Sequence, residues 1–271
     1  MDTSSKKEIK KAEIPVVILC GGKGTRLKEE TEIIPKPLVR IGERPILWHI
    51  MKIYNSFGFS RFILPTGYRG EKIKDYFLNY PLHQGDFTID FTEGKRNVTI
   101  HTPVEERWRV TVVGTGLEAE TGARLKRIVS YINSDIFLLT YGDGVANVDI
   151  DKLVAFHRAQ GKMVTMTGIH PPARFGHIKI HDTGVNFMEK PQIQDSYING
   201  GFFVCNRAVF DRLSDGKDLN FEKHVLSQLA TESQLAVYRH DGYWQCMDTV
   251  RDMEFLNEEW NKGTAAWKVW Q

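Results

Sequence analysis

The sequence predicts an α/β fold in which a mostly parallel β-sheet carries helices on both faces. Short apolar runs rich in β-branched residues alternate along the chain with longer amphipathic stretches, which is the rhythm of βαβ units. The chain has 271 residues, of which 41% are hydrophobic, enough to bury one sizeable core. We therefore expect a solvated extension at residues 1–13 and a single domain at residues 14–271.

The predicted elements follow from hydrophobic periodicity and from turn residues. In residues 44–58, for example, Ile46, Ile50 and Ile53 share one helical face, and Gly58 is a plausible stop. We expect strands at 16–19, 61–67, 136–144 and 163–169, and helices at 44–58, 69–80, 149–161 and 250–261. Residues 87–113 alternate apolar and polar residues and predict antiparallel strands added beside the sheet; residues 174–206 predict further strands and loops.

Composition excludes several classes of partner. The net charge of +2 gives no overall attraction to nucleic acid or to a membrane surface. No apolar run approaches the ~20 residues of a membrane span, and the polar N-terminus lacks the apolar core of a signal peptide. The odd number of widely spaced cysteines, Cys20, Cys205 and Cys246, indicates reduced thiols in a cytoplasmic protein.

A glycine-rich turn, GGKGTRL at residues 21–27, follows the first strand. Glycines let backbone N–H groups approach an anion closely. The spacing fits neither the Walker loop nor the GxGxxG dinucleotide loop. Lys23 and Arg26 instead supply cations of the kind needed by a triphosphate whose pyrophosphate leaves, although a tight turn with exposed charges has the same composition.

Three further positions are candidates for the same site. Lys36 lies between two prolines, which fix the backbone around one lysine. Asp143 follows a buried strand, at the edge where ligands of open α/β sheets collect, and Asp248 precedes the last helix. Two such carboxylates are able to share one Mg²⁺. Taken alone, however, Asp143 is also typical of a turn, and Asp248 is also typical of a helix N-cap.

The order of motifs GGKGTRL, PKPLV, YGDG, MEKP, NGGFFV and MDT resembles the sugar-1-phosphate nucleotidyltransferases. Within that family, segments such as LLTYGDGVANVDI and GYWQCMDTVRD are most similar to the glucose-1-phosphate cytidylyltransferases. The resemblance spans nearly the whole chain. It implies a Rossmann-like, mostly parallel mixed sheet with a small added antiparallel β region, and it implies a homo-oligomer.

The resemblance also implies a reaction and its residues. CTP and α-D-glucose 1-phosphate would give CDP-glucose and pyrophosphate, for deoxysugar and surface-polysaccharide (lipopolysaccharide O-antigen) synthesis. Catalysis would rest on Lys36 and Arg26, and Mg²⁺ on Asp143 and Asp248. The nucleotide would lie against Leu19, Gly21, Gly22, Gly24, Thr25, Arg26, Thr121, Gly122 and Arg124. The sugar phosphate would lie against Tyr141, Glu189, Lys190, Asn199 and Gly200.

Two departures from the family pattern leave alternatives open. Ile34 replaces the first lysine of the family's KPKP motif, and Gly114 stands where the cytidylyltransferases carry an aspartate. The second departure bears on the choice of base. A relative that uses another nucleoside triphosphate or another sugar 1-phosphate is therefore one alternative, and a nucleotide-binding domain without turnover is the other.

Overall fold

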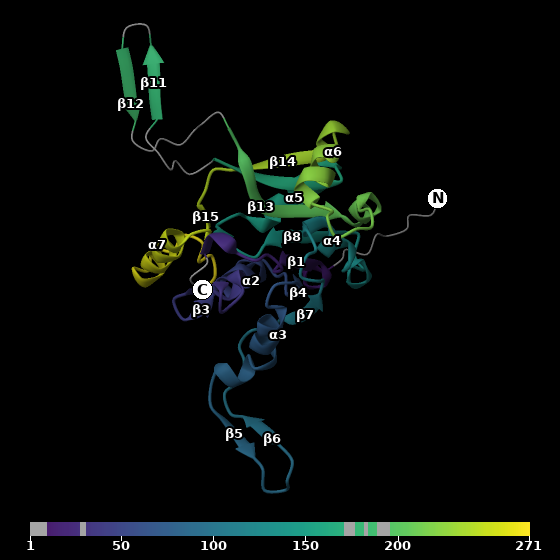
Figure 1. Cartoon of the computed structure of the whole chain (residues 1–271), viewed down its shortest axis with the longest axis vertical. Helices are drawn as coiled ribbons and strands as arrows, with labels where there is room; N and C mark the ends of the chain where they lie inside the picture. The colour runs from purple at the N-terminus through teal and green to yellow at the C-terminus, as the bar shows by residue number, and fades with distance from the viewer. Residues whose placement is uncertain (1–9, 28–30, 171–176, 182–183, 189–195) are drawn as a thin grey trace.

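The computed structural model describes residues 10–27, 31–170, 177–181, 184–188 and 196–271. Its centre is a seven-stranded sheet (Figure 1). The strands of this sheet, in chain order, are β1 (Pro15–Leu19), β4 (Arg61–Thr66), β7 (Arg109–Gly114), β8 (Ile136–Tyr141), β10 (Val164–Ile169), β13 (Ile198–Asn206) and β14 (Leu235–His240). They lie in the spatial order β14-β10-β13-β8-β1-β4-β7.

One strand makes this sheet mixed. β13 runs antiparallel to both of its neighbours, β8 and β10, whereas all other neighbouring pairs are parallel. The predicted mostly parallel mixed sheet is therefore confirmed.

Small antiparallel pairs surround the main sheet, as Figure 1 shows. They are β2 (Arg40–Ile41) with β3 (Arg44–Pro45), β5 (Phe87–Asp90) with β6 (Asn97–Ile100), β9 (Gly144–Ala146) with β15 (Trp244–Cys246), and β11 (His177–His181) with β12 (Gly184–Met188). The β5–β6 hairpin and the β11–β12 hairpin project from the body in different directions.

Four helices occur where the periodicity predicts them: α2 (Ile46–Ser56), α3 (Gly70–Leu78), α5 (Ile150–Gln160) and α7 (Val250–Asn261). Two short helices, α4 (Thr121–Lys126) and α6 (Ser227–Thr231), were not predicted. The side chain of Asp149 caps α5 by accepting a hydrogen bond from Lys152 N. Gly58, just beyond α2, has φ 88°, a conformation that favours glycine. All four predicted helices and all four predicted strands appear within a few residues of their expected bounds.

Two hydrophobic clusters form the core, one on each face of the sheet. Val16 and Ile18 belong to one cluster, together with residues of α2, α5 and α7. Val17 and Leu19 belong to the other, together with Leu125 of α4 and Leu229 of α6. Alternate residues of β1 thus point to opposite faces, and β1 is buried throughout because helices cover both.

The prediction for residues 87–113 was partly wrong. β5 and β6 do form an antiparallel hairpin, but β7 joins the main sheet parallel to β4. The chain leaves β4 through α3 and the hairpin, so it returns in the direction of β4. β7 is an edge strand of half-buried residues, which gives it the alternation typical of an antiparallel ribbon.

Candidate active site

The glycine-rich loop lies at the carboxyl end of β1, where a short 3₁₀ turn, Thr25–Leu27, follows it. Gly24 has φ 62°, in the left-handed region that glycine tolerates. The Thr31 hydroxyl braces the loop by donating to the carbonyls of Gly24 and Leu27, at 3.0 and 2.9 Å. A Cβ added at Gly22 would meet no atom within 4 Å, so this backbone is open to a ligand.

Arg124 stabilises the same loop by hydrogen bonding. Its guanidinium, on α4, donates to the carbonyl of Gly21 at 2.9 Å and to the carbonyl of Thr66 at 3.1 Å. It also donates to Thr115 Oγ1 and to the carbonyls of Gly116 and Leu117. A Cβ added at Gly21 would lie 2.1 Å from the guanidinium carbon. Arg124, a predicted nucleotide contact, therefore directs these donors to four backbone carbonyls and one side-chain hydroxyl of the protein.

Lys36 brings the two aspartates together. Its Nζ lies 2.6 Å from Asp143 Oδ2 and 2.6 Å from Asp248 Oδ1. The Lys36 side chain is only 12% exposed. Burial alone would lower the pKa of Lys36, but the carboxylates of Asp143 and Asp248 outweigh burial and raise it. The ammonium is therefore charged throughout the neutral range.

Local structure explains why each of these three side chains reaches the same point. Pro35 and Pro37 enclose Lys36 at the start of a 3₁₀ turn, Lys36–Leu38, and Asp143 follows β8 at the sheet edge. Thr249, rather than Asp248, is the N-cap of α7 and forms a capping box with Asp252. This arrangement directs the Asp248 backbone N–H to Asp252 Oδ2 at 3.1 Å and leaves the Asp248 carboxylate for Lys36.

Arg26 also contacts this cluster. Its guanidinium lies 2.8 Å from Asp248 Oδ2 and its side chain is 72% exposed. Lys23, at the other side of the loop, pairs with Glu118 at 3.0 Å. The cations that the sequence singled out thus each face a carboxylate at the mouth of the site.

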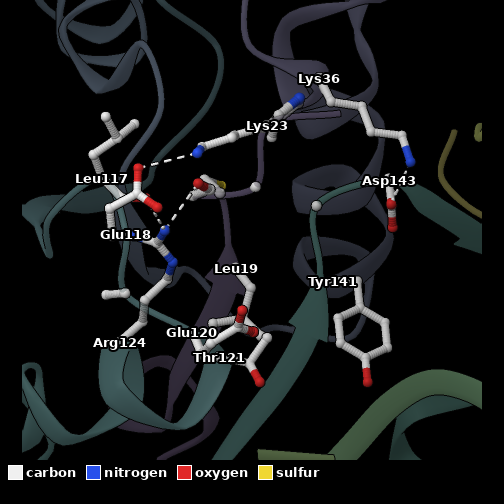
Figure 2. A pocket seen from close by; sticks show the side chains of 16 residues that line it. Leu19, Lys23, Lys36, Leu117, Glu118, Glu120, Thr121, Arg124, Tyr141 and Asp143 are labelled. Carbon is white, nitrogen blue, oxygen red and sulfur yellow. Dashed lines mark hydrogen bonds and ion pairs between the residues drawn. The ribbon is translucent and has the colours of Figure 1, made fainter. Parts of the chain in front are cut away.

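A cavity of about 420 Å³ lies between the loop, α4 and the end of β8. Figure 2 shows Lys23 and Lys36 at one end, Tyr141 and Asp143 along one side, and Leu19, Glu120 and Thr121 at the other end. Its lining residues are Leu19, Cys20, Gly21, Gly22, Lys23, Lys36, Pro37, Leu117, Glu118, Ala119, Glu120, Thr121, Arg124, Tyr141, Gly142 and Asp143. One end is therefore cationic, and the other combines the apolar side chain of Leu19 with the Glu120 carboxylate and the Thr121 hydroxyl.

The predicted sugar-side residues are brought to the same region in part. Asn199 Nδ2 donates to the hydroxyl of Tyr141 at 2.8 Å, and Asn199 Oδ1 accepts from Gly201 N at 2.8 Å. The Gly200 carbonyl accepts from Trp244 Nε1 at 2.7 Å. Glu189 and Lys190, also predicted here, lie outside the described residues.

Sequence reasoning missed Glu222. Its carboxylate accepts hydrogen bonds from Thr121 Oγ1 at 2.6 Å and from the Tyr141 hydroxyl at 2.7 Å. No motif marked it, because it is separated in sequence from both partners. Gly122, a predicted nucleotide contact, packs against Leu219, where an added Cβ would lie 2.8 Å from that residue. Gly114 is absent from the cavity lining.

A family model described as nucleotidyl transferase matches residues 15–261. The chain belongs to the nucleotidyl transferase family. It is 48% identical over 257 residues to the glucose-1-phosphate cytidylyltransferase of Salmonella typhimurium, covering 94% of this chain and 99% of the relative. It is 44% identical over 254 residues to the probable glucose-1-phosphate cytidylyltransferase of Bacillus subtilis, covering 94% and 99%.

Solved structures support the same nucleotidyl transferase fold. HddC from Yersinia pseudotuberculosis superposes with a TM-score of 0.65 at 23% identity, covering 91% of this chain and 99% of that one. A UDP-glucose pyrophosphorylase complexed with UDP-glucose superposes with a TM-score of 0.65 at 15% identity, covering 92% and 99%. Among the described residues, no helix has the length and apolar character needed to cross a membrane.

Proposed function

We propose that this nucleotidyl transferase acts as a glucose-1-phosphate cytidylyltransferase, which converts CTP and α-D-glucose 1-phosphate to CDP-glucose and pyrophosphate. The observation that carries the proposal is the position of Lys36 between Asp143 and Asp248, beside the glycine-rich loop. The near full-length similarity to cytidylyltransferases supports the choice of substrates.

The chemistry is a displacement at phosphorus. A phosphate oxygen of glucose 1-phosphate attacks the α-phosphorus of CTP in line, a new P–O bond forms, and the bond to the bridging oxygen of pyrophosphate breaks. The nucleophile is already an anion, so no protein nucleophile or general base is required. Catalysis then depends on holding two anionic reactants together and neutralising their charge.

The residues of this chain divide that work by position. The loop amides of Gly21 and Gly22, which line the cavity, bind the triphosphate together with those of Gly24 and Thr25 in the same loop. Lys36 and Arg26 place positive charge beside the phosphate that is transferred. Leu19 and Thr121 line the opposite end, where the nucleoside lies. On the sugar side we retain Tyr141, Glu189, Lys190, Asn199 and Gly200 as the proposed contacts.

Asp143 and Asp248 fit a magnesium ion. Their carboxylates come from two distant segments, and each lies 2.6 Å from the Lys36 ammonium. Carboxylate oxygens are the ligands that Mg²⁺ prefers. No cluster of three metal-ligating side chains occurs in the part of the chain that the structure describes. An ion held by Asp143 and Asp248 would take its remaining ligands from water and substrate phosphate. Bound Mg²⁺ would supply charge neutralisation to the triphosphate.

A pyrophosphate-release panel tests the proposal. The purified chain is assayed with CTP, UTP, GTP and dTTP against α-D-glucose 1-phosphate, mannose 1-phosphate and galactose 1-phosphate, and products are identified by mass spectrometry. We expect CDP-glucose as the dominant product. A preference for another pair would establish the alternative of a relative with different substrates, and no release with any pair would establish a domain without turnover.

We also infer that the chain forms a homo-oligomer in the cytoplasm. Leu78 on α3, with Phe87, Phe91 and Ile100 on the β5–β6 hairpin, exposes apolar side chains of the kind that protein interfaces cover. All three cysteines are free thiols, as expected in a reducing compartment. Sedimentation velocity tests the oligomer: a single species of monomer mass at micromolar concentration would contradict it.

A further inference from the structure

The Glu222 carboxylate forms hydrogen bonds to residues on two sides of the cavity, although Glu222 itself does not line it. It lies in a short π-helical turn, Phe221–Leu226, a geometry that often occurs at functional sites. One carboxylate oxygen accepts from Thr121 Oγ1 at 2.6 Å and the other from the Tyr141 hydroxyl at 2.7 Å. Thr121 and Tyr141 both line the cavity, and Glu222 lies behind them.

The hydrogen-bond directions along this chain are fixed. A carboxylate only accepts, so Tyr141 donates its single hydroxyl hydrogen to Glu222. The Tyr141 oxygen is then an acceptor for Asn199 Nδ2, at 2.8 Å. The Asn199 amide is oriented from its other end as well, because its oxygen accepts from Gly201 N at 2.8 Å.

Thr121 is oriented in the same way. Its hydroxyl oxygen accepts from the backbone N–H of Phe221 at 2.9 Å, so its hydrogen goes to Glu222. Burial and the negative charge of Glu222 both raise the pKa of Tyr141, which keeps its hydroxyl protonated as a donor. The donors and acceptors of the whole network thus follow from one carboxylate that accepts through both of its oxygens.

The consequence concerns the second hydrogen of Asn199 Nδ2. Tyr141 accepts one of the two amide hydrogens, and within the described part of the chain no protein group accepts the other. We propose that Glu222 is a positioning residue for the sugar phosphate: through the Tyr141 hydroxyl it orients the Asn199 amide so that its second N–H meets a sugar hydroxyl. This inference rests on the proposed function, since it assumes that the acceptor is a sugar phosphate.

A double-mutant cycle of Glu222→Gln and Tyr141→Phe tests this role. Glutamine replaces one of the two acceptor oxygens by a donor, and phenylalanine removes the hydroxyl that transmits the orientation. We expect each variant to raise KM for glucose 1-phosphate about 5–10-fold, the scale of one hydrogen bond, with kcat changed less than about threefold. The double variant is expected to resemble the single variants, because both changes break one chain of contacts.

Asn220→Ala is the matched control for the same turn. The Asn220 side chain caps the turn by accepting from Lys223 N at 2.8 Å and donates to the Glu120 carboxylate at 3.2 Å. It takes part in neither of the hydrogen bonds that the Glu222 carboxylate accepts from Thr121 and Tyr141. We expect this variant to lose about 1 kcal/mol of stability and to keep both KM values. Any effect of a loosened turn alone therefore appears in the control.

Several outcomes would overturn the inference. Glu222→Gln with an unchanged KM for glucose 1-phosphate is one, and effects of the two substitutions that multiply are another. An equal rise of the KM for glucose 1-phosphate in Asn220→Ala would show that Glu222 acts only by stabilising the turn. If Glu222→Gln fails to fold, Glu222→Asp takes its place in the cycle, with the same expected non-additivity. Failure of the proposed function is distinguishable, because it appears in the wild-type substrate panel before any variant is compared.

Discussion

Lys36 and Asp248 form a half-buried ion pair, 2.6 Å between Nζ and Oδ1, although one residue lies in the first part of the chain and the other just before the last helix. The same carboxylate takes the guanidinium of Arg26 through its other oxygen, at 2.8 Å. A carboxylate shared by two cations has little freedom to move. The active-site charges are therefore set in place by one another before substrate binds.

Replacement of Lys36 tests the central charge. We expect Lys36→Ala to lower kcat by about 10²–10³-fold, the scale for one charge-stabilising group, with a smaller effect on KM for CTP. Steady-state pyrophosphate release measures both. Lys95→Ala, which removes the same charge from an exposed site in the β5–β6 turn, serves as the control, and near-normal turnover of Lys36→Ala would reject its catalytic role.

The pH dependence of Lys36 follows from the direction of its pKa shift. Because the folded pKa of Lys36 is raised above 10.5, the stabilisation from its ion pairs is complete below 10.5 and is lost only as pH rises through the folded value. We therefore expect that deprotonation of Lys36 causes no loss of activity between pH 7 and pH 10. This range of about three pH units lies below the folded pKa of Lys36. A pH–rate profile that falls with an apparent pKa near 8 in wild type but not in Lys36→Arg would contradict this.

Metal removal tests the two aspartates. We expect EDTA to abolish turnover and Mg²⁺ to restore it, since two carboxylates and a triphosphate suit this ion. Mg²⁺ together with CTP should also raise the melting temperature of wild type, because ligands stabilise the state that binds them, but not that of Asp143→Asn or Asp248→Asn. The control Asp215→Asn, which changes an exposed carboxylate, should behave as wild type. Full turnover after EDTA treatment would show that the reaction requires no metal ion.

Alanine substitutions at the neighbouring glycines Gly21 and Gly22 should affect different properties, stability at Gly21 and CTP binding at Gly22. A methyl at Gly21 would meet the Arg124 guanidinium at 2.1 Å, so we expect Gly21→Ala to cost about 1–3 kcal/mol of stability, as overpacking does. Gly22 has open space around it, and Gly22→Ala should change stability by less than about 0.5 kcal/mol while weakening CTP binding. Urea denaturation and calorimetric CTP titration measure the two effects; equal stabilities of the two variants would contradict the packing argument.

His49 should make stability depend on pH. Burial among Trp48, Trp260 and Trp267 lowers the pKa of His49 from 6.5 to about 4, despite its bond to the carbonyl of Ile41. The unfolded chain therefore binds the proton more tightly, and its contribution to stability is complete above pH 6.5 and declines as pH falls toward 4. The shift corresponds to ~3 kcal/mol.

Urea denaturation between pH 4 and pH 7 (a span of about three units around the two pKa values) measures this dependence. His49→Gln should lower stability at neutral pH and flatten its decline on acidification, because the titrating group is gone. His83→Gln removes an exposed histidine and should leave the wild-type slope intact. Equal slopes in wild type and His49→Gln would show that other groups control acid stability.

The sequence predicted the parts of the molecule that depend on local periodicity. The strands near residues 16–19, 61–67, 136–144 and 163–169, the helices near residues 44–58, 69–80, 149–161 and 250–261, and the meeting of Lys36, Asp143 and Asp248 were predicted and appear in the structure. β7 was misread because an edge strand and an antiparallel ribbon share the same alternation. Glu222 and the backbone-directed role of Arg124 could not be read from the sequence, since both depend on contacts between distant segments.

The place of Asp248 in the chain has a consequence during synthesis on the ribosome. The glycine-rich loop, Lys36 and Asp143 emerge before the strand pair β9–β15 can form, because β15 (Trp244–Cys246) immediately precedes Asp248. A domain generally folds as a unit during synthesis, and the central strand β8 pairs with β13, which is made later. The charged cluster of Lys36, Asp143 and Asp248 is therefore completed only when almost the whole chain has emerged.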